Sequence, residues 1–181
     1  MLDFRSKLAN YRCLTARVDD LCCRIAAEYA ESLSCREGCG DCCRKFTLFP
    51  VEAVAISCAL DTLSAEESSY IRGRARFAAN SEACPLLENG RCLLYSARPL
   101  ICRTHGFPLI TGGDGRRTID FCPKNFMGVK SFPAAFLLDL DILNTTLAAI
   151  NAVFLSSCNL FQYQADERLN IAEALLLKIH D

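Results

Sequence analysis

The sequence predicts a mainly α-helical single domain built around an irregular, cysteine-rich centre that includes a small β-hairpin. Both ends of the chain repeat apolar side chains at steps of three and four, the spacing of one buried helix face. The middle instead gathers four cysteines and two glycines in the nine residues 35–43. With 181 residues the chain is about one domain in size, so we treat residues 1–181 as a single domain.

Overall charge and hydropathy restrict the classes of protein to which this chain can belong. The chain has 20 basic and 21 acidic side chains and a formal net charge of -1, which gives no reason to bind nucleic acid or an anionic membrane. No apolar run approaches the roughly 18 residues of a spanning helix, because Asp139 and Asp141 interrupt the most apolar stretch. The first residues also lack the apolar core of a secretion signal. We therefore expect a soluble cytoplasmic protein.

Residues 2–34 are predicted to form one long amphipathic helix. Charged side chains occupy its other faces, and its apolar face consists of Tyr11, Leu14, Val18, Leu21, Ile25 and Tyr29. Cys13, Cys22 and Cys23 lie within this helix. Free cysteine behaves as a small apolar side chain, so we expect these three to fill the core.

Two shorter helices are predicted to follow. Residues 44–49 alternate enough to be extended, and Pro50 then suits the first turn of a helix over residues 50–60. Ser64-Ala65-Glu66-Glu67 is a capping-box pattern that opens a helix running to about Ala79.

Turn residues in the middle of the chain predict two hairpins. Asn89-Gly90 marks a tight turn, so Cys84 and Cys92 are expected to flank a hairpin-like loop. Residues 108–121 have a glycine-rich centre and are predicted to form a β-hairpin that returns the chain beside Cys102.

The C-terminal part is predicted to be helical from Pro133. One apolar helix is expected to run to about Ser157, and Asp166 is expected to cap a last helix. The cysteine-cluster region, residues 35–123, is thus flanked by the N-terminal helix 2–34 and by C-terminal helices within residues 133–179.

Thirteen cysteines point to metal binding rather than to disulfides. Their number is odd and the chain lacks an export signal. Cys42 and Cys43 are neighbours, so their Cα atoms lie about 3.8 Å apart, whereas disulfides usually need about 4.4 Å or more. Reduced thiols are favoured, and thiolate sulfur is a preferred ligand of zinc and of iron in iron-sulfur clusters.

The order of the cysteine motifs resembles a known family. Cys35-x3-Cys39-x2-Cys42-Cys43 is followed by Cys84-Pro85-Leu86-Leu87, Cys92-Leu93-Leu94-Tyr95, Arg98-Pro99, Cys102-Arg103 and Cys122. Over residues 35–123 this combination resembles the YkgJ-type cysteine-cluster family (CxxCxxCC), which is described as chelating zinc or iron. The three-residue gap after Cys35 departs from the two-residue gap in the family's label. A related cluster in flagellin lysine methylases is associated with an iron-sulfur centre.

Eight cysteines are candidate metal ligands: Cys35, Cys39, Cys42, Cys43, Cys84, Cys92, Cys102 and Cys122. Successive side chains point to opposite faces in extended backbone and diverge by about 100° in a helix. Cys42 and Cys43 therefore more naturally serve two centres, unless one of them packs. One four-thiolate centre is expected, and a second is left open.

Three further residues are candidates for the surroundings of the centre: Arg98, Arg103 and His105. Four thiolates around Zn²⁺ or a [4Fe-4S]²⁺ core leave a formal charge of about -2, so nearby cations stabilise the site. Arg98 and Arg103 lie inside the motif and suit this role. His105 stands three residues after Cys102, and we expect it beside the ligands rather than among them.

Long cysteine spacings in the second half and two cysteine-proline steps favour an iron-sulfur cluster, of the 4Fe-4S type, over Zn²⁺. Such a cluster can transfer electrons or activate a ligand. A structural zinc in an interaction module and a metal storage or delivery protein are the alternatives. The sequence identifies no catalytic residue, substrate or protein partner, and whether the protein is an enzyme stays open.

Overall fold

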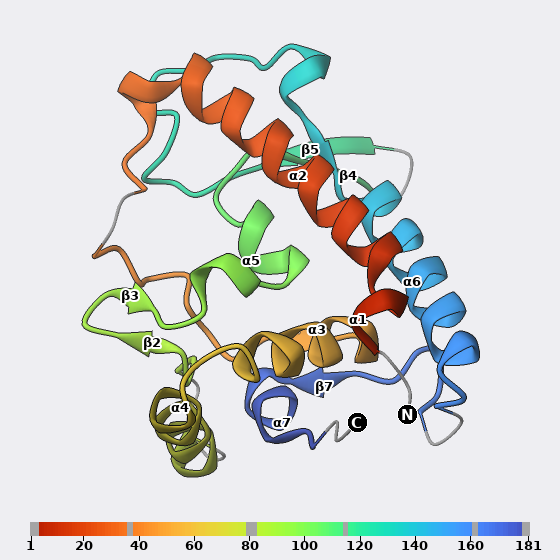
Figure 1. The fold of residues 1–181 in the computed structure, drawn as a ribbon. Coiled ribbons are helices and arrows are strands. Elements are labelled where there is room, and N and C mark those ends of the chain that lie inside the picture. The colour runs from red at the N-terminus through yellow and green to blue at the C-terminus, as the bar shows by residue number, and fades with distance from the viewer. Residues whose placement is uncertain (1–3, 36–37, 79–82, 114–115, 161–162, 179–181) are drawn as a thin grey trace.

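The computed structural model describes residues 4–35, 38–78, 83–113, 116–160 and 163–178 (Figure 1). Within these residues α-helices make up most of the regular structure, and the strands form small sheets of two or three. The two longest helices, α2 (Ala9–Glu28) and α6 (Leu140–Ser157), pack against each other, and the short α5 (Leu100–Thr104) packs against α2. The fold is mainly α-helical, as predicted.

The N-terminal helix predicted over residues 2–34 is present but interrupted. α1 (Phe4–Lys7) and α2 are separated at Leu8, and a short 3₁₀ helix follows at Ala30–Ser32. Residues 2 and 3 lie outside the described part of the chain. The predicted apolar face is confirmed by the burial of Tyr11, Val18 and Ile25.

The three cysteines of α2 differ in burial. Cys22 is buried, whereas Cys13 and Cys23 are exposed. The expectation that all three fill the core is therefore wrong for Cys13 and Cys23. One helix face recurs every three or four residues, and of these cysteines Cys22 alone stands at that step between the buried Val18 and Ile25.

Helix α3 (Pro50–Leu60), predicted over the same residues, connects two hydrophobic cores. Val51 and Val54 pack into a core formed with α1, α2 and α6. Ala53, Ile56 and Leu60 pack into a second core formed with α4 and α7. A helix that is apolar on all sides is stable only when it is buried, and α3 occupies that internal position.

Helices α4 (Ala65–Phe77) and α7 (Ile171–Leu176) cover the second core and begin with matching caps. Ser64 caps α4 as predicted, because its Oγ accepts a hydrogen bond from the Glu67 N–H at 3.2 Å. The prediction that Asp166 caps the last helix is wrong. Asn170 caps α7, its Oδ1 accepting from the Glu173 N–H at 3.0 Å.

The residues before α7 form a strand that the local pattern did not reveal. β7 (Leu169–Asn170) pairs antiparallel with β1 (Thr47–Leu48), within the segment predicted to be extended. This pairing joins the C-terminal part of the chain to the segment that leaves the cysteine loop. It therefore fixes the end of that loop against the second core.

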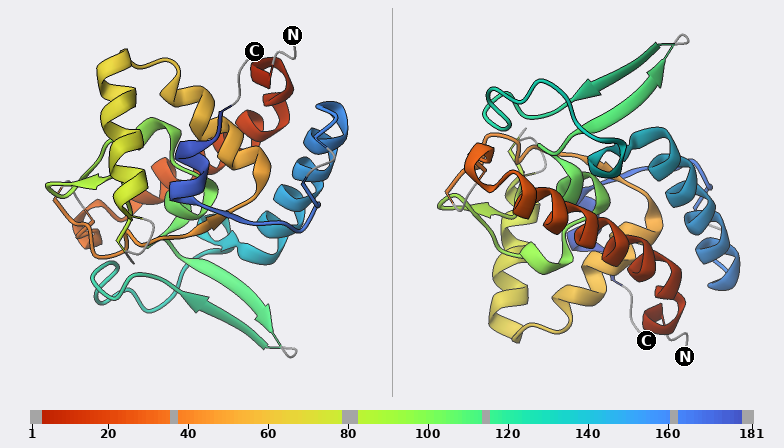
Figure 2. Two further views of the ribbon diagram at one scale, coloured as in Figure 1. Left: turned by 90° about the horizontal axis from the view of Figure 1, so that it is seen from below. Right: turned by 90° about the horizontal axis from the view of Figure 1, so that it is seen from above.

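Both predicted hairpins are present. β2 (Leu87–Glu88) and β3 (Arg91–Cys92) are joined through Asn89 and Gly90, whose φ angles are 49° and 77°. β4 (Leu109–Gly113) and β5 (Arg116–Asp120) form the longer hairpin, which projects from the body of the protein (Figure 2).

The helix predicted to begin at Pro133 begins later. A 3₁₀ helix at Ala134–Phe136 is followed by β6 (Leu138–Asp139), which pairs in parallel with β4. α6 then starts at Leu140, where the Asp139 Oδ1 accepts from the Ile142 N–H at 3.0 Å. The prediction is wrong because a pairing with a distant strand competes with helix formation in this segment.

Among the described residues, α6 is the one helix long and apolar enough to cross a membrane. Length and composition alone are weak evidence of a membrane-spanning helix, because core helices of soluble proteins have the same length and composition. Here α6 packs against α2, α3 and β4.

Glu52 connects α3 to α5, the helix that carries Cys102. Its Oε2 accepts from the Phe49 N–H at 3.1 Å, and its Oε1 accepts from the Leu100 N–H at 2.9 Å. Burial raises the pKa of Glu52, and these two backbone donors oppose that rise. One buried carboxyl group thus satisfies the first turns of two helices and fixes their relative position.

We predict that Glu52→Ala lowers the free energy of unfolding by about 2–4 kcal/mol, because two buried N–H donors lose their acceptor. Glu67→Ala is the matched control, since Glu67 occupies the same position in α4 but is exposed. The control should cost no more than about 1 kcal/mol. Chemical denaturation measures the free energy of unfolding of the two variants. An equal loss of stability in Glu52→Ala and Glu67→Ala would contradict the role of Glu52.

Candidate metal centre

The eight candidate cysteines come from four segments. Four lie in the loop that precedes β1, two in or just before the β2–β3 hairpin, one on α5 and one just after β5: Cys35, Cys39, Cys42 and Cys43; Cys84 and Cys92; Cys102; and Cys122. Cys35 is exposed and the other seven are partly buried. The loop before β1 runs beside β2 and β3 (Figures 1 and 2).

Glycines allow the cysteine loop to contact the hairpin. The Gly38 N–H donates to the Gly90 carbonyl oxygen at 3.3 Å. Gly90 has a φ of 77°, and a Cβ at this position would lie 2.7 Å from the Gly38 Cα. Only glycine tolerates both this backbone conformation and this close approach. The contact between the two segments therefore depends on Gly90.

Backbone contacts also join Cys43, Cys84 and Cys92. The Cys84 N–H donates to the Cys43 carbonyl oxygen at 3.4 Å, next to a bridge between Arg44 and Ala83. Cys92 pairs with Leu87 in the hairpin. These three cysteines are thus placed by strand-like pairing and hairpin geometry.

Arg74 of α4 fixes the hairpin from outside. Its guanidinium donates to the carbonyl oxygens of Pro85 and Leu87 at 2.9 Å and 2.7 Å. It also pairs with the Glu88 carboxylate at 3.0 Å. The three contacts hold the segment between Cys84 and the turn against α4.

Asn125 joins the segments of Cys35 and Cys122. Its Oδ1 accepts from the N–H groups of Ser34 and Cys35, each at 3.1 Å, and its Nδ2 donates to the Gly106 carbonyl oxygen at 3.0 Å. The Asn125 N–H in turn donates to the Cys122 carbonyl oxygen at 2.8 Å. Asn125 is buried, so water does not compete for these groups.

The electrostatic neighbours of the thiols divide the eight cysteines into two groups of four. The pKa of the Cys102 thiol is raised to about 12, first by burial and then by the thiols of its group. We call this group the Cys43 set: Cys43, Cys84, Cys92 and Cys102. The pKa of Cys35 is also raised, first by partial burial of its sulfur and then by three other thiols. We call these four the Cys35 set: Cys35, Cys39, Cys42 and Cys122.

The two sets meet at Cys42 and Cys43. The pKa of the Cys43 thiol is raised to about 11, first by burial and then by Cys42 of the other set. The side chains of these two residues are also hydrogen-bonded to each other. The boundary between the sets therefore coincides with one peptide bond.

The donor chemistry of each set fits zinc or an iron-sulfur cluster. Each set offers four thiol groups, the soft donors that both prefer. All thirteen cysteines are free. Within the described residues, no three His, Cys, Asp or Glu side chains are close enough together to hold a metal ion. Convergence of the eight sulfurs on metal therefore stays a prediction.

A comparison with known families matches residues 34–123 to the model described as "CxxCxxCC: Putative zinc- or iron-chelating domain". Residues 34–123 belong to the CxxCxxCC family. The matched segment contains all eight candidate cysteines, so the resemblance stated from the motifs is confirmed. No curated protein and no solved structure matches the chain. Metal binding, of zinc or iron, is the property that the family supports.

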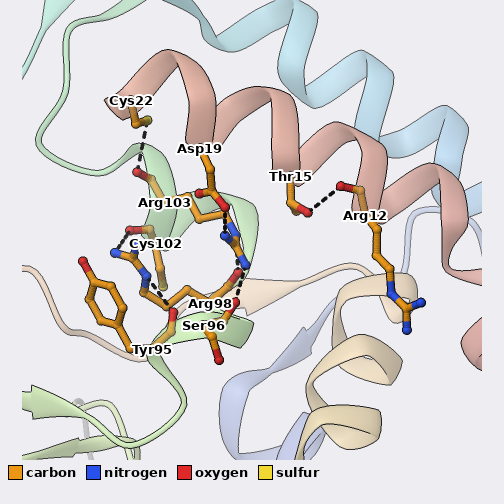
Figure 3. A network of polar contacts seen from close by, with 9 residues as sticks. All are labelled: Arg12, Thr15, Asp19, Cys22, Tyr95, Ser96, Arg98, Cys102 and Arg103. Atoms are coloured by element: carbon orange, nitrogen blue, oxygen red, sulfur yellow. Dashed lines mark hydrogen bonds and ion pairs between the residues drawn. The ribbon is translucent and has the colours of Figure 1, made fainter. Parts of the chain in front are cut away.

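In this CxxCxxCC domain Arg98 is a cation that acts on thiols of both sets. Its Nε donates to the Tyr95 carbonyl oxygen at 3.0 Å and its Nη1 to the Cys102 carbonyl oxygen at 3.4 Å (Figure 3). Its charge lowers the pKa of Cys102 and Cys92 in one set and of Cys35 in the other, in each case against a larger rise from burial. Arg98 thus lies within electrostatic reach of thiols of both sets, and its role beside a metal stays a prediction.

Arg103 contacts two backbone carbonyl groups and an acidic side chain of α2. Its Nε donates to the Arg98 carbonyl oxygen at 2.7 Å, its Nη2 donates to the Ser96 carbonyl oxygen at 2.8 Å, and its Nη1 pairs with Asp19 of α2 (Figure 3). The Arg103 carbonyl oxygen accepts from the Cys22 thiol at 3.5 Å. These contacts attach α5, and with it Cys102, to α2.

His105 ends α5 and packs beside an aromatic ring. Its ring centroid lies 5.7 Å from that of Phe46. This contact does not show whether His105 lies beside the candidate ligands, so its expected place there stays a prediction.

Sequence reasoning missed Asn125, Arg74 and Lys124. Lys124 pairs with Asp41 of the cysteine loop and lies within electrostatic reach of Cys39 and Cys122. The position of Lys124 and Asn125 directly after Cys122-Pro123 is the local signal that could have drawn attention to them. Their partners are distant in sequence, so their contacts could not be predicted.

We predict opposite effects for two glycine substitutions. Gly90→Ala should lower the free energy of unfolding by about 2 kcal/mol or more, because the new Cβ meets the backbone of Gly38 and φ is positive. Gly73 lies inside α4, and a Cβ at this position would have nothing within 4 Å. Gly73→Ala should therefore raise the free energy of unfolding by about 0.5–1 kcal/mol. Chemical denaturation measures both. A neutral Gly90→Ala would contradict the contact with Gly38.

We also predict that Asn125→Ala lowers the free energy of unfolding by about 1–3 kcal/mol, since partly buried N–H groups of Ser34 and Cys35 lose their acceptor. Hydrogen exchange at these two amides should accelerate. Asn144→Ala, on an exposed part of α6, is the control and should change stability by less than about 0.5 kcal/mol. Unchanged exchange at Ser34 and Cys35 would refute the role of Asn125.

Proposed function

We propose that this protein binds iron as an iron-sulfur cluster, of the 4Fe-4S type, through its clustered cysteine thiolates. The observation that carries the proposal is that thiols from four separate segments lie within electrostatic reach of one another in a domain of a zinc- or iron-chelating family. The proposed ligands are the eight cysteines of the Cys35 set and the Cys43 set. An iron-sulfur cluster supplies electron transfer, or activation of a ligand where one iron is not bound by cysteine.

The local surroundings support iron-sulfur over zinc. Zinc sites of this type usually use two Cys-x2-Cys pairs on tight turns, and the second half of the domain has no such pair. Instead Leu86 and Leu94, both buried, stand two residues after Cys84 and Cys92. Apolar side chains next to the thiols limit water, a factor that sets cluster potentials.

The protein's own residues then have three roles. The thiols supply the ligands, Arg98 and Lys124 place positive charge beside them, and Asn125 and Arg74 hold the segments that carry them. We place the protein in the cytoplasm, where reduced thiols are maintained.

The second candidate is a structural zinc site in an interaction module, and the family description names zinc beside iron. Storage or delivery of metal is a third. Zinc would give a colourless protein with stoichiometric metal, and storage would give weak, exchangeable binding.

Metal analysis with a visible spectrum of anaerobically purified protein tests the proposal. We expect iron and sulfide, and a brown colour that bleaches on reduction. Cys84→Ser should lower the bound iron, whereas Cys13→Ser and Cys23→Ser, at exposed positions of α2, should not. Stoichiometric zinc without iron would overturn the iron-sulfur assignment. Absence of any bound metal would overturn metal binding itself.

We predict that Arg98→Gln lowers the reduction potential of the iron-loaded protein, because loss of a nearby cation disfavours an added electron. Arg98→Lys keeps the charge and should shift the potential less. A redox titration followed by absorbance compares the three proteins. Equal shifts in the two variants would show that Arg98 acts through its backbone contacts instead.

A further inference from the structure

We propose that the chain holds two separate four-thiolate centres, one formed by the Cys35 set and one by the Cys43 set, on either side of the Cys42-Cys43 peptide bond. This inference rests on the proposed function, because it assumes that the thiols bind metal. It goes further by assigning each cysteine to one centre.

Different hydrogen bonds join two members of each set. Cys35 and Cys122 are joined through Asn125, whose side chain accepts from the Cys35 N–H at 3.1 Å and whose N–H donates to the Cys122 carbonyl oxygen at 2.8 Å. Cys43 and Cys84 are joined by a direct backbone hydrogen bond of 3.4 Å. The first connection is made by the segment after β5 and the second by the segment leading into β2, so different parts of the fold build the two sets.

A tight turn divides the motif that contributes to both sets. The Cys43 N–H donates to the Gly40 carbonyl oxygen at 2.9 Å, and the Arg44 N–H donates to the Cys42 carbonyl oxygen at 3.0 Å. The Cys42 and Cys43 side chains are hydrogen-bonded to each other, but their other thiol neighbours differ. Cys42 is a neighbour of Cys35, and Cys43 is a neighbour of Cys102. Cys42 completes the first set with Cys39, and Cys43 completes the second.

The cations around the sets match two anionic centres. Four thiolates on a divalent ion or a [4Fe-4S]²⁺ core leave about -2 at each centre. Lys124 acts on Cys39 and Cys122 of the Cys35 set. Arg98 acts on Cys92 and Cys102 of the Cys43 set and also on Cys35. Each centre therefore has a nearby positive charge, and Arg98 lies within electrostatic reach of both.

The test is a titration of the reduced, metal-free full-length chain with Co²⁺ under anaerobic conditions, followed by the visible and thiolate-to-cobalt absorption bands. As each thiol binds Co²⁺ it releases its proton to the buffer. The wild-type chain should bind two equivalents with tetrahedral thiolate spectra.

Single substitutions should each remove one centre. Cys122→Ser from the Cys35 set and Cys84→Ser from the Cys43 set should each bind one equivalent, and the double variant none. Cys23→Ser, at an exposed position of α2, is the control and should still bind two. Cys39→Ser and Cys92→Ser repeat the test within each set if either first variant fails to fold.

The outcomes separate this inference from the proposed function. One equivalent in the wild-type chain, or complete loss of binding in either single variant, would overturn the assignment of two centres while leaving metal binding intact. No thiolate spectrum in the wild-type chain would overturn metal binding itself.

Discussion

The arrangement of the cysteines depends most on the hydrogen bonds of the Asn125 side chain. This side chain contacts two segments that carry or adjoin candidate ligands, the start of the cysteine loop and the turn after α5, from a third, the segment after β5. Without such cross-links, loops rich in cysteine and glycine would lose more conformational entropy on ordering than their few apolar contacts return. A buried amide that satisfies two N–H donors and one carbonyl acceptor provides that order within the protein itself.

Once deprotonated, the thiols oppose the arrangement. Burial and mutual proximity raise the pKa values of Cys35, Cys43 and Cys102, so four thiolates in one place repel each other unless a cation is present. A bound metal relieves this repulsion directly. Arg98 relieves part of it through charge while its guanidinium stays attached to backbone carbonyl oxygens. The domain thus combines a helical scaffold of ordinary apolar packing with a cysteine region whose electrostatics favour a bound cation.

Local patterns predicted what depends on neighbouring residues. The proline and apolar run of α3, the Ser64 cap of α4 and the Asn89-Gly90 turn were all found where expected, because each is determined within a few positions. The late start of α6 and the Asn170 cap of α7 were missed, because β6 and β7 form only by pairing with β4 and β1. At the centre, the motif predicted the family, whereas the eight candidate ligands and the divergence of Cys42 and Cys43 stay predictions. The proposed division of the cysteines into two sets required the contacts of Asn125 and the hydrogen bond between Cys43 and Cys84, which join residues far apart in the chain.

X-ray absorption at the metal edge of the anaerobically purified protein tests the central claim most directly, because it identifies the element and its nearest ligands together. Our account predicts a first coordination shell of about four sulfur atoms at about 2.3 Å, with iron neighbours if the metal is in a cluster. A shell dominated by nitrogen or oxygen would contradict it.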